Sequence, residues 1–362
     1  MFFGFFIGAI LLVGLVYVQL DTFGGRYTRK VKEKLKKSKH FSKGQFQNLE
    51  HTPNFAEGVN VWTVFKKQFQ RKNKNLRPQK AVPAKGINWS QVPNNSVLWL
   101  GHSSLFLKIQ GISILVDPVR TVYASPLKGV NKSFPIEPAL DFKTLENLDY
   151  ILITHDHYDH LDRQTIKQLK HLQATFICGL GVNIHLQRWG IPTSKIKELE
   201  WWDTFNLNKA VKLHFLPTRH FSGRKWYRNN TLWGSFMLET LKKTIYLGGD
   251  SGYGTHFKTI ARKFPKIDVA FLELGQYNAM WPYIHMQPED FEKAVKDLKV
   301  RKVIPIHHSA FALSTHAWNE PHQKIIKLSE HWEQEKLYIP QIGEPIDFDE
   351  SIPPQNYWWE NI

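Results

Sequence analysis

Two hydrophobic patterns divide the chain. From residue 1 to residue 20 the side chains are apolar almost without interruption, and only Gln19 is clearly polar. From Val97 onward, short apolar runs alternate with polar and turn-forming residues. The first pattern is typical of a helix in an apolar medium, whereas the second predicts a folded domain of strands and helices.

The apolar run at the N-terminus predicts a membrane anchor. Twenty helical residues extend about 30 Å, which is the thickness of the hydrocarbon core of a bilayer. A cleaved signal peptide would need basic residues before the run and a small-x-small site after it, and the sequence VYVQLDTF provides no such site. Nothing polar interrupts the run to form the outer face of a core helix. We therefore expect residues 1–20 to form an uncleaved transmembrane helix.

Positive charge is concentrated directly after this run. Residues 21–86 contain 17 Lys and Arg against four Asp and Glu, whereas residues 87–362 contain 31 against 28. The basic cluster from Arg26 to Lys39 predicts that the rest of the chain lies on the cytoplasmic side, and it makes an anionic membrane surface an expected partner. The cluster could instead serve topology alone. Nucleic-acid binding by the cluster is a third interpretation, but it is not expected, because the cluster lies directly against the anchor and the remainder of the chain is near neutral.

The remainder of the chain predicts sheets covered by helices. A tight turn at Gln110-Gly111 separates two of the expected strands. The expected strands are 97–100, 104–109, 112–116, 150–154, 212–216, 233–239, 244–247, 269–273 and 303–306, and the expected helices are 163–172 and 288–298. This alternation does not by itself select a fold. It divides the chain into an anchor (1–20), a basic lead-in (21–86), a catalytic domain (87–346) and a C-terminal tail (347–362).

Cysteine usage limits the chemistry. The chain has a single cysteine, Cys178, so it forms no intramolecular disulfide and no cysteine-based zinc cluster. Any metal site must therefore be built from His, Asp and Glu. The 17 histidines supply enough candidates.

The strongest motif is H-x-H-x-D-H, from His155 to His160, directly after the apolar run YILIT. Two histidines two positions apart at the end of a strand point the same way, so His155 and His157 can share a metal ion. The turn that follows can bring Asp159 and His160 to a second ion about 3.5–4 Å away. A solvated polar loop is the alternative.

Three further candidates follow successive strands. His220 comes after KLHFLPT, Asp250 ends TIYLGGD, and His307 ends VIPIH. Each could be an ordinary residue when taken alone. Together, at strand ends and in this order, they complete a set of ligands for two metal ions, in which an aspartate can bridge the two cations.

These motifs resemble the metallo-β-lactamase superfamily, and within it the phospholipase D type that hydrolyses N-acylphosphatidylethanolamine. The resemblance covers about residues 40–346. The strings that carry it are WLGHSSLFLKIQGISILVDPV, ITHDHYDHLD, RHFSGRKWYRNNTLWGSF, YLGGDSGYG, IHMQPEDF and IPIHHSAFALSTHAWNEP. The implied fold is of the α+β class, a four-layer αββα sandwich with the site at one edge between the sheets.

The resemblance also implies a set of roles. One metal ion, expected to be zinc, would take His155, His157 and His220, and a second would take Asp159, His160 and His307. Asp250 would bridge the two ions, so that Asp159 and Asp250 serve catalysis as ligands. Asp117 would be a supporting acid, and His285 would contact substrate or transfer a proton.

Two departures from the family pattern leave questions open. His308 and Ser309 follow His307 where the family often has Trp-Gly, so either histidine could be the last ligand. Phe221 replaces a usual tryptophan and could reshape the wall of the pocket. Several aromatic residues could line an acyl groove or could be core residues: Trp201, Trp202, Trp226, Trp281 and Tyr283.

The expected function is hydrolysis of a phosphodiester by a water molecule that two metal ions activate. The resemblance favours a phospholipid such as N-acylphosphatidylethanolamine, and by analogy a homodimer. The alternatives are another hydrolase on the same fold, namely a lactonase, a soluble phosphodiesterase or a nuclease, and a membrane-associated scaffold protein without activity. The complete ligand set argues against the scaffold.

Overall fold

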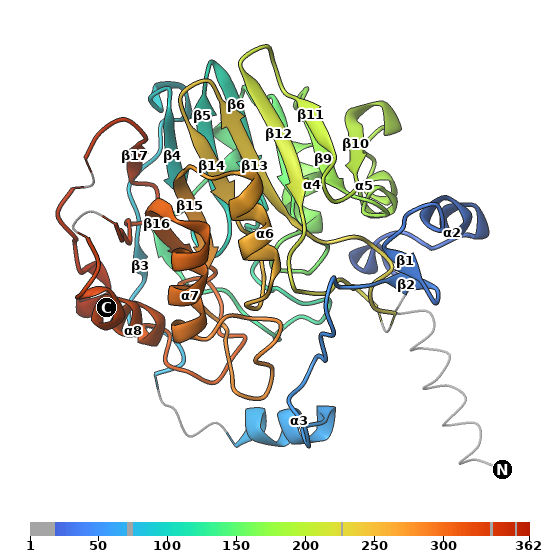
Figure 1. Ribbon diagram of the computed structural model, residues 1–362, viewed down its shortest axis with the longest axis horizontal. Helices are drawn as coiled ribbons and strands as arrows, with labels where there is room; N and C mark the ends of the chain where they lie inside the picture. Colours follow the sequence, from blue (N-terminus) through green and yellow to red (C-terminus); the bar gives the residue numbers. More distant parts are fainter. Residues whose placement is uncertain (1–18, 71–74, 226, 334–335, 352) are drawn as a thin grey trace.

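The centre of the molecule is a pair of β-sheets packed face to face, shown in Figure 1. The computed structural model describes residues 19–362 except 71–74, 226, 334–335 and 352. The two sheets take successive parts of the chain, so each forms mainly from strands that are neighbours in the sequence. Most of the loops that carry the candidate ligands lie at the carboxyl ends of their parallel strands.

The first sheet combines a parallel half with an antiparallel half. In spatial order its strands are β10 (Ile196–Leu199), β9 (Thr175–Gly179), β8 (Tyr150–Ile153), β6 (Ile112–Val116), β5 (Leu105–Ile109), β4 (Ser96–Trp99) and β17 (Pro345–Asp347). Strands β6, β8, β9 and β10 are parallel, and β5, β4 and β17 add antiparallel pairs.

The second sheet has the same mixed character. Its strands in spatial order are β11 (Thr204–Asn206), β12 (Val211–Leu216), β13 (Ser235–Thr240), β14 (Thr244–Leu247), β15 (Ile267–Glu273) and β16 (Val300–Ile306). Strands β14, β15 and β16 are parallel, whereas β11 to β14 are antiparallel. Two smaller pairs complete the strands: β1 (Phe41–Ser42) with β2 (Gln45–Phe46), and β3 (Val82–Pro83) with β7 (Ile136–Glu137).

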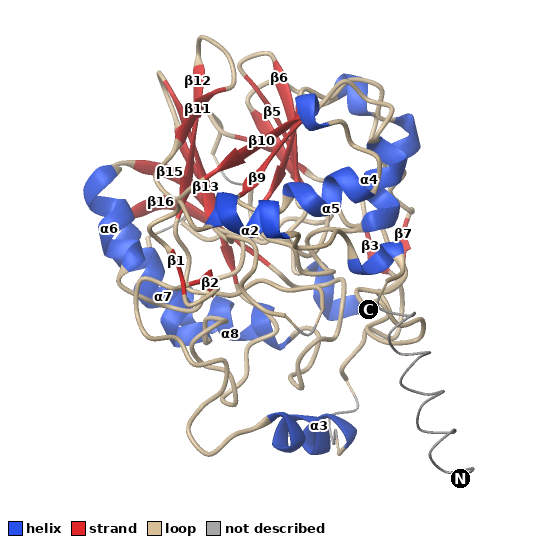
Figure 2. Ribbon diagram, turned by 90° about the vertical axis from the view of Figure 1, so that its right-hand side faces the viewer, coloured by secondary structure: helices blue, strands red, loops and turns tan. Residues whose placement is uncertain are grey.

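Helices cover the outer face of each sheet, as Figure 2 shows. Beside the first sheet lie α4 (Arg163–Leu169) and α5 (Asn183–Arg188), and beside the second lie α6 (His256–Lys263) and α7 (Pro288–Leu298), with α8 (Glu320–Ser329) packed on α7. The lead-in adds α2 (Arg29–Leu35) and α3 (Val61–Phe69). Short 3₁₀ helices lie at Asp21–Phe23, Trp89–Gln91, Phe142–Thr144, Thr193–Lys195 and Trp358–Asn361. The layers therefore follow the expected order of helix, sheet, sheet and helix.

The core lies between the sheets and under the helices. Every residue of β15 is buried, because a strand in the middle of such a sandwich is covered on both faces. The sheets approach closely at Gly179. A Cβ atom there would lie 2.2 Å from the carbonyl oxygen of Leu232 and 3.1 Å from the ring of Phe215. Only a residue without a side chain fits this contact.

Local signals explain the helix boundaries. The carboxylate of Asp162 accepts hydrogen bonds from the backbone N–H groups of Gln164 and Thr165, which caps α4. Helix α7 begins at Pro288, a residue suited to the first helical turn. It ends at Leu298, and the next residue, Lys299, has a left-handed backbone with φ 53°.

All nine predicted strands and both predicted helices are present, with boundaries shifted by up to three residues. The predicted helix 163–172 ends earlier, at Leu169. Among the elements that were not predicted are β9, β10, β11, β17, α5, α6 and α8. Their apolar runs are short, and they become distinct elements only because the neighbouring strands and helices cover them.

The lead-in and the tail both pack against the sandwich. In α2, Leu35 is buried, and Lys34 forms an ion pair with Glu198 of β10. At the other end of the chain, Trp358 and Trp359 are buried. Part of the basic cluster therefore binds the folded body itself, and the domain boundaries at 86 and 346 remain predictions.

The predicted membrane anchor is not supported. Residues 1–18 lie outside the described part of the chain, and the described residues of the predicted run are Gln19 and Leu20. Within the described residues, no helix combines the length and the apolar character needed to cross a bilayer. This finding contradicts the prediction of a single-pass membrane protein with its catalytic domain on the cytoplasmic side. The prediction relied on the apolar side chains of one run, with no information on tertiary structure.

Candidate metal centre

The predicted ligands meet at one end of the sandwich. They lie in the loops that follow β8, β12, β14 and β16, and the carboxyl ends of the parallel strands bring these loops to the same edge. The ligand atoms form groups within 4.8 Å of one another. All seven predicted ligands belong to these groups: His155, His157, Asp159, His160, His220, Asp250 and His307.

The first group consists of His155, His157 and His220. Nδ1 of His157 lies 2.8 Å from Nε2 of His155 and 3.3 Å from Nε2 of His220. The other nitrogen of His220 lies 2.9 Å from the carbonyl oxygen of Ile284, and Nδ1 of His155 lies 3.0 Å from Oγ1 of Thr154. These contacts orient the two imidazoles so that their remaining nitrogens converge on one point.

The second group consists of Asp159, His160 and His307, with His102 beside them. Nδ1 of His160 lies 2.8 Å from Oδ2 of Asp117, a carboxylate that also accepts the backbone N–H of Thr154 at 2.8 Å. Asp117 therefore holds His160 with Nε2 directed into the site, which is the supporting position expected for it.

Asp250 lies between the two groups. Its Oδ1 is 3.1 Å from Nε2 of His160 and 3.0 Å from Nδ1 of His307. Its Oδ2 is 3.8 Å from Nε2 of His155 and 3.7 Å from Nε2 of His220. Each carboxylate oxygen thus faces one group, which is the arrangement that a bridging ligand requires.

Unsatisfied atoms at the centre fit a metal site. Among the described residues, Nε2 of His160, Oδ1 of Asp250 and Nε2 of His307 are buried and have no hydrogen-bond partner, because the close approaches of His160 and His307 to Asp250 lack hydrogen-bond geometry. Buried polar atoms are nearly always satisfied in proteins, so a cluster of unsatisfied ones marks a missing partner. Imidazole nitrogen and carboxylate oxygen are suitable ligands for zinc and related divalent cations.

The electrostatics of the cluster favour metal-binding forms of most side chains. Burial and the surrounding imidazoles hold the pKa values of His155, His220 and His307 well below the usual range, so these rings are neutral. Burial opposes ionisation of Asp250, but His160 outweighs it and the pKa falls to about 2. His160 differs: although burial opposes its charge, Asp250 and Asp159 raise its pKa, and a metal ion would displace that proton.

The structure separates the two histidines at the end of β16. His307 faces Asp250, whereas His308 lies on the other side of the chain. Nε2 of His308 is 3.1 Å from the carbonyl oxygen of Pro305, and its Nδ1 is 3.1 Å from Nε2 of His322. Since both nitrogens of His308 are engaged away from the cluster, His307 is the candidate ligand.

Two neighbours of the cluster were not identified from the sequence. His102 contacts Asp159, and Oε2 of Glu273 lies 2.7 Å from Nδ1 of His285. Burial raises the pKa of Glu273 to about 7, against the opposing effect of His285. The sequence contained a sign of each residue. His102 directly follows the first strand of the domain, in the string GHSS, and Glu273 is a charged residue inside the apolar run VAFLEL.

A small pocket of about 170 Å³ opens onto the cluster. His157, Asp159, Asp250 and His307 lie in its wall together with His285. The remaining lining residues are Phe221, Gln276, Trp281, Ile284 and Leu313. The lining of the pocket thus combines metal ligands with apolar side chains, and we call these apolar side chains the pocket rim. Of the aromatics considered above, Trp281 reaches the pocket, Trp201 packs against Trp233, and Trp226 lies outside the described residues.

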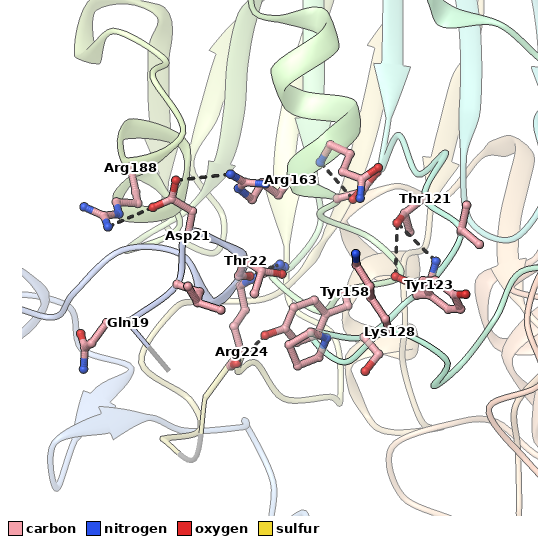
Figure 3. Close-up of a pocket in the computed structure, with 16 residues that line it drawn as sticks. Gln19, Asp21, Thr22, Thr121, Tyr123, Lys128, Tyr158, Arg163, Arg188 and Arg224 are labelled. Atoms are coloured by element: carbon pink, nitrogen blue, oxygen red, sulfur yellow. Dashed lines mark hydrogen bonds and ion pairs between the residues drawn. The ribbon is translucent and has the colours of Figure 1, made fainter. Parts of the chain in front are cut away.

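A larger cavity of about 860 Å³ lies beside the metal centre (Figure 3). Its wall includes Tyr158 of the H-x-H-x-D-H motif, whose hydroxyl donates to the carbonyl oxygen of Arg224 at 2.7 Å. Asp21 of the lead-in forms ion pairs there with Arg188 at 2.9 Å and Arg163 at 3.3 Å. These contacts fasten the lead-in beside the motif, and the cavity contains none of the seven predicted ligands.

Comparison with known proteins assigns the chain to a family. The family described as the beta-lactamase superfamily domain matches residues 113–308. An uncharacterized protein of Mycobacterium tuberculosis is 33% identical over 316 residues, which cover 86% of this chain and 84% of that protein. The N-acyl-phosphatidylethanolamine-hydrolyzing phospholipase D 1 of Caenorhabditis elegans is 26% identical over 306 residues, covering 78% of this chain and 86% of that protein.

The fold comparison agrees. The crystal structure of a possible metal-dependent hydrolase from Veillonella parvula superposes with a TM-score of 0.58 at 15% identity, covering 70% of this chain and 99% of that one. The resemblance seen in the sequence motifs is thereby confirmed. The chain is a metal-dependent hydrolase and belongs to the metallo-β-lactamase superfamily.

Proposed function

We propose that the chain is a two-zinc phosphodiesterase whose substrate is a phospholipid, N-acylphosphatidylethanolamine or a close relative. The observation that carries the proposal is the position of Asp250, whose two carboxylate oxygens face the two groups of ligands. One ion would take His155, His157 and His220, and the other Asp159, His160 and His307, with Asp250 shared. When bound, two such ions lower the pKa of water and stabilise negative charge on a phosphoryl oxygen.

The residues of the chain contribute orientation and proton control. Glu273 accepts the hydrogen bond of Nδ1 of His285, so Nε2 is the ring nitrogen left for a substrate in the pocket. We infer that His285 gives a proton to the departing alcohol, and its position in the lining of the pocket beside the ligands supports this role. Phe221, Trp281 and Ile284 give the pocket an apolar lining beside these groups.

Two observations support a lipid substrate. The relative from C. elegans carries the name of a phospholipase D that hydrolyses N-acylphosphatidylethanolamine. The lining of the pocket includes the apolar side chains of Phe221, Trp281 and Ile284, against which the glycerol and the first methylene groups of a lipid would lie. A lipid would therefore place its phosphodiester at the metal ions and its chains outside the pocket.

One observation favours a second candidate, a hydrolase of small soluble esters. The pocket of about 170 Å³ is smaller than the typical 300–1,000 Å³ of ligand sites, and it accommodates a headgroup but not an acyl chain. A soluble phosphodiester or a lactone would fit inside it entirely. The substrate test must therefore include both classes.

The test measures metal content and substrate range on the full chain purified in detergent. We expect about two zinc ions per chain and release of phosphatidic acid from N-acylphosphatidylethanolamine. Asp250→Asn should lose both. Asp268→Asn is the matched control. Asp268 is also a buried carboxylate, but it lies at the start of β15, far from the strand ends that carry the metal ligands, and it accepts the N–H of Thr244.

The outcomes separate the candidates. Hydrolysis of a chromogenic phosphodiester or a lactone without hydrolysis of the lipid would exclude the phospholipase and keep the fold and site. A chain that binds no metal would exclude the mechanism as a whole. Loss of metal in Asp268→Asn as well would mean that the effect of Asp250→Asn reflects folding.

A further inference from the structure

Helix α3 exposes large apolar side chains to solvent. Trp62 is 79% exposed and Val61 is 63% exposed, and Phe65, one helical turn after them, is 52% exposed. The rings of Trp62 and Phe65 meet edge to face with centroids 6.3 Å apart. Residues three and four positions apart are neighbours on the surface of a helix, so Phe65 joins Trp62 and Val61 in one apolar face, which we call the α3 face.

The helix is anchored to the rim of the metal pocket. Upstream of α3, the N–H of Ala56 donates to the carbonyl oxygen of Met280 at 2.9 Å. Val59 and Val64 pack against the cluster of Met280, Trp281 and Ile284. Because Trp281 and Ile284 also line the metal pocket, Val64 brings α3 into contact with the pocket rim, while the α3 face stays exposed to solvent.

The position of α3 in the fold agrees with these contacts. Figures 1 and 2 both show α3 at the periphery, apart from the sheets and from the other helices. The side chain of Asn60 caps the helix by accepting the N–H of Thr63 at 3.0 Å. The helix is thus ordered by its own cap and by its contact with the pocket rim.

Charge identifies the kind of partner. Lys66 and Lys67 follow Phe65 on α3 and are both exposed. The segment 21–86 that contains α3 has 17 Lys and Arg against four Asp and Glu. A short helix that combines tryptophan and aliphatic residues on one face with lysines beside it is typical of binding at the headgroup level of an anionic membrane.

We propose that the α3 face inserts into the headgroup region of an anionic phospholipid surface and holds the mouth of the metal pocket against that surface. The inference rests on the proposed function in one respect: the docking serves hydrolysis only if the substrate is a phospholipid. The docking itself does not depend on catalysis. It explains how a pocket too small for an acyl chain acts on a lipid. The phosphodiester enters the pocket, and the acyl chains stay in the lipid layer beside α3.

The first experiment reads the position of α3 directly. Cys178 is buried, so a cysteine introduced by Trp62→Cys can be labelled with an environment-sensitive fluorophore, and the unsubstituted chain serves as the labelling blank. The matched control is Leu241→Cys. Leu241 is 97% exposed in the turn between β13 and β14, at the opposite end of the strands from Asp250.

Vesicles of phosphatidylcholine with phosphatidylglycerol should raise and blue-shift the emission of the label at 62 and leave the label at 241 unchanged. Vesicles of phosphatidylcholine alone should give a smaller change, because the lysines then lack an anionic partner. No change at 62 on either vesicle overturns the inference. A change at 62 that follows protein concentration without vesicles also overturns it, because the α3 face then pairs with a second copy of the chain.

The second experiment separates docking from chemistry. The double substitution Val61→Ser with Trp62→Ser should lower hydrolysis of lipid in vesicles about tenfold, which corresponds to about 1.4 kcal/mol of lost apolar contact with the membrane. Hydrolysis of a soluble chromogenic phosphodiester should not change. If the unsubstituted chain does not cleave lipid at all, the proposed function fails while the label still reports docking. If both substrates are affected equally, the α3 face serves the fold and the docking inference fails.

Discussion

Nε2 of His102 lies 2.9 Å from Oδ2 of Asp159, and the two residues are separated by 57 positions in the sequence. The backbone of His102 also accepts the N–H of His307 at 2.8 Å and donates to the carbonyl oxygen of His308 at 3.0 Å. His102, which follows the first strand of the domain, therefore contacts both the carboxylate of Asp159 and the backbone at the end of β16. His102 thus links Asp159 and His307, which are predicted ligands of the same metal ion.

The first prediction concerns this contact. We expect His102→Ala to weaken binding of one metal ion about 10- to 100-fold, because Asp159 loses the partner that orients it. Titration with a competing chelator would measure the two affinities separately. His214→Ala is the control, since His214 is a buried histidine that pairs with Glu239 at 2.9 Å, away from the cluster. Equal metal affinity in the two variants would show that His102 does not support the site.

The second prediction distinguishes His307 from His308. His307→Ala should reduce the metal content by about one ion per chain, because His307 faces Asp250. His308→Ala should keep both ions and lower the free energy of unfolding by about 1–3 kcal/mol, because Pro305 and His322 lose a buried hydrogen-bond partner. Metal analysis combined with urea unfolding tests both variants. The reverse pattern of metal loss would make His308 the ligand.

The third prediction concerns Glu273. Its carboxylate accepts from Nδ1 of His285 at 2.7 Å and from the backbone N–H of Met286 at 2.7 Å. The two donors meet different oxygens of Glu273, and the amide of Glu273→Gln keeps an oxygen at only one of these positions. With that oxygen at Met286, the NH2 group faces Nδ1 of His285, which loses the acceptor that orients it. We expect kcat to fall about 10- to 100-fold with KM and metal content little changed.

The substrate series sharpens this test. If His285 protonates the departing alcohol, Glu273→Gln should impair poor leaving groups more than good ones such as nitrophenol. A uniform loss over all leaving groups would contradict the role in proton transfer and leave Glu273 as a structural residue.

The fourth prediction concerns stability at low pH. Burial, followed by the charge of Arg219, lowers the pKa of His256 from 6.5 to about 3. The unfolded chain therefore binds one more proton than the folded chain between these two values. The contribution of His256 to stability is complete above pH 6.5 and is lost as the pH falls, by about 2 kcal/mol at pH 5.

Comparison with His256→Asn isolates this effect from other titrating groups. The free energy of unfolding, measured with urea, should fall between pH 7 and pH 5 in both proteins. The fall should be about 2 kcal/mol smaller in the variant than in the unsubstituted chain. Equal losses would show that His256 is protonated in the folded state. The 3.0 Å hydrogen bond between Nε2 of His256 and Oγ of Ser251 would then need a charged donor.

Local patterns in the sequence were sufficient for the strands and for most of the site. The apolar runs before His155, Asp250 and His307 predicted strands, and the structure contains each of them. A residue that directly follows a buried strand has its direction set by that strand, so a strand end is a reliable place to look for a ligand. The membrane anchor was predicted from one apolar run alone, and no helix among the described residues supports it.

Contacts between distant segments decided the rest. The sequence alone determined the class of chemistry, since seven His and Asp residues at strand ends with one cysteine in the chain leave metal-dependent hydrolysis as the best interpretation. Only the tertiary structure decided that His307 and not His308 faces Asp250, that His102 supports Asp159, and that α3 borders the pocket. The physical reason is that side-chain direction and burial at these positions depend on which strands become neighbours, and the chain determines that only when its two sheets pack together.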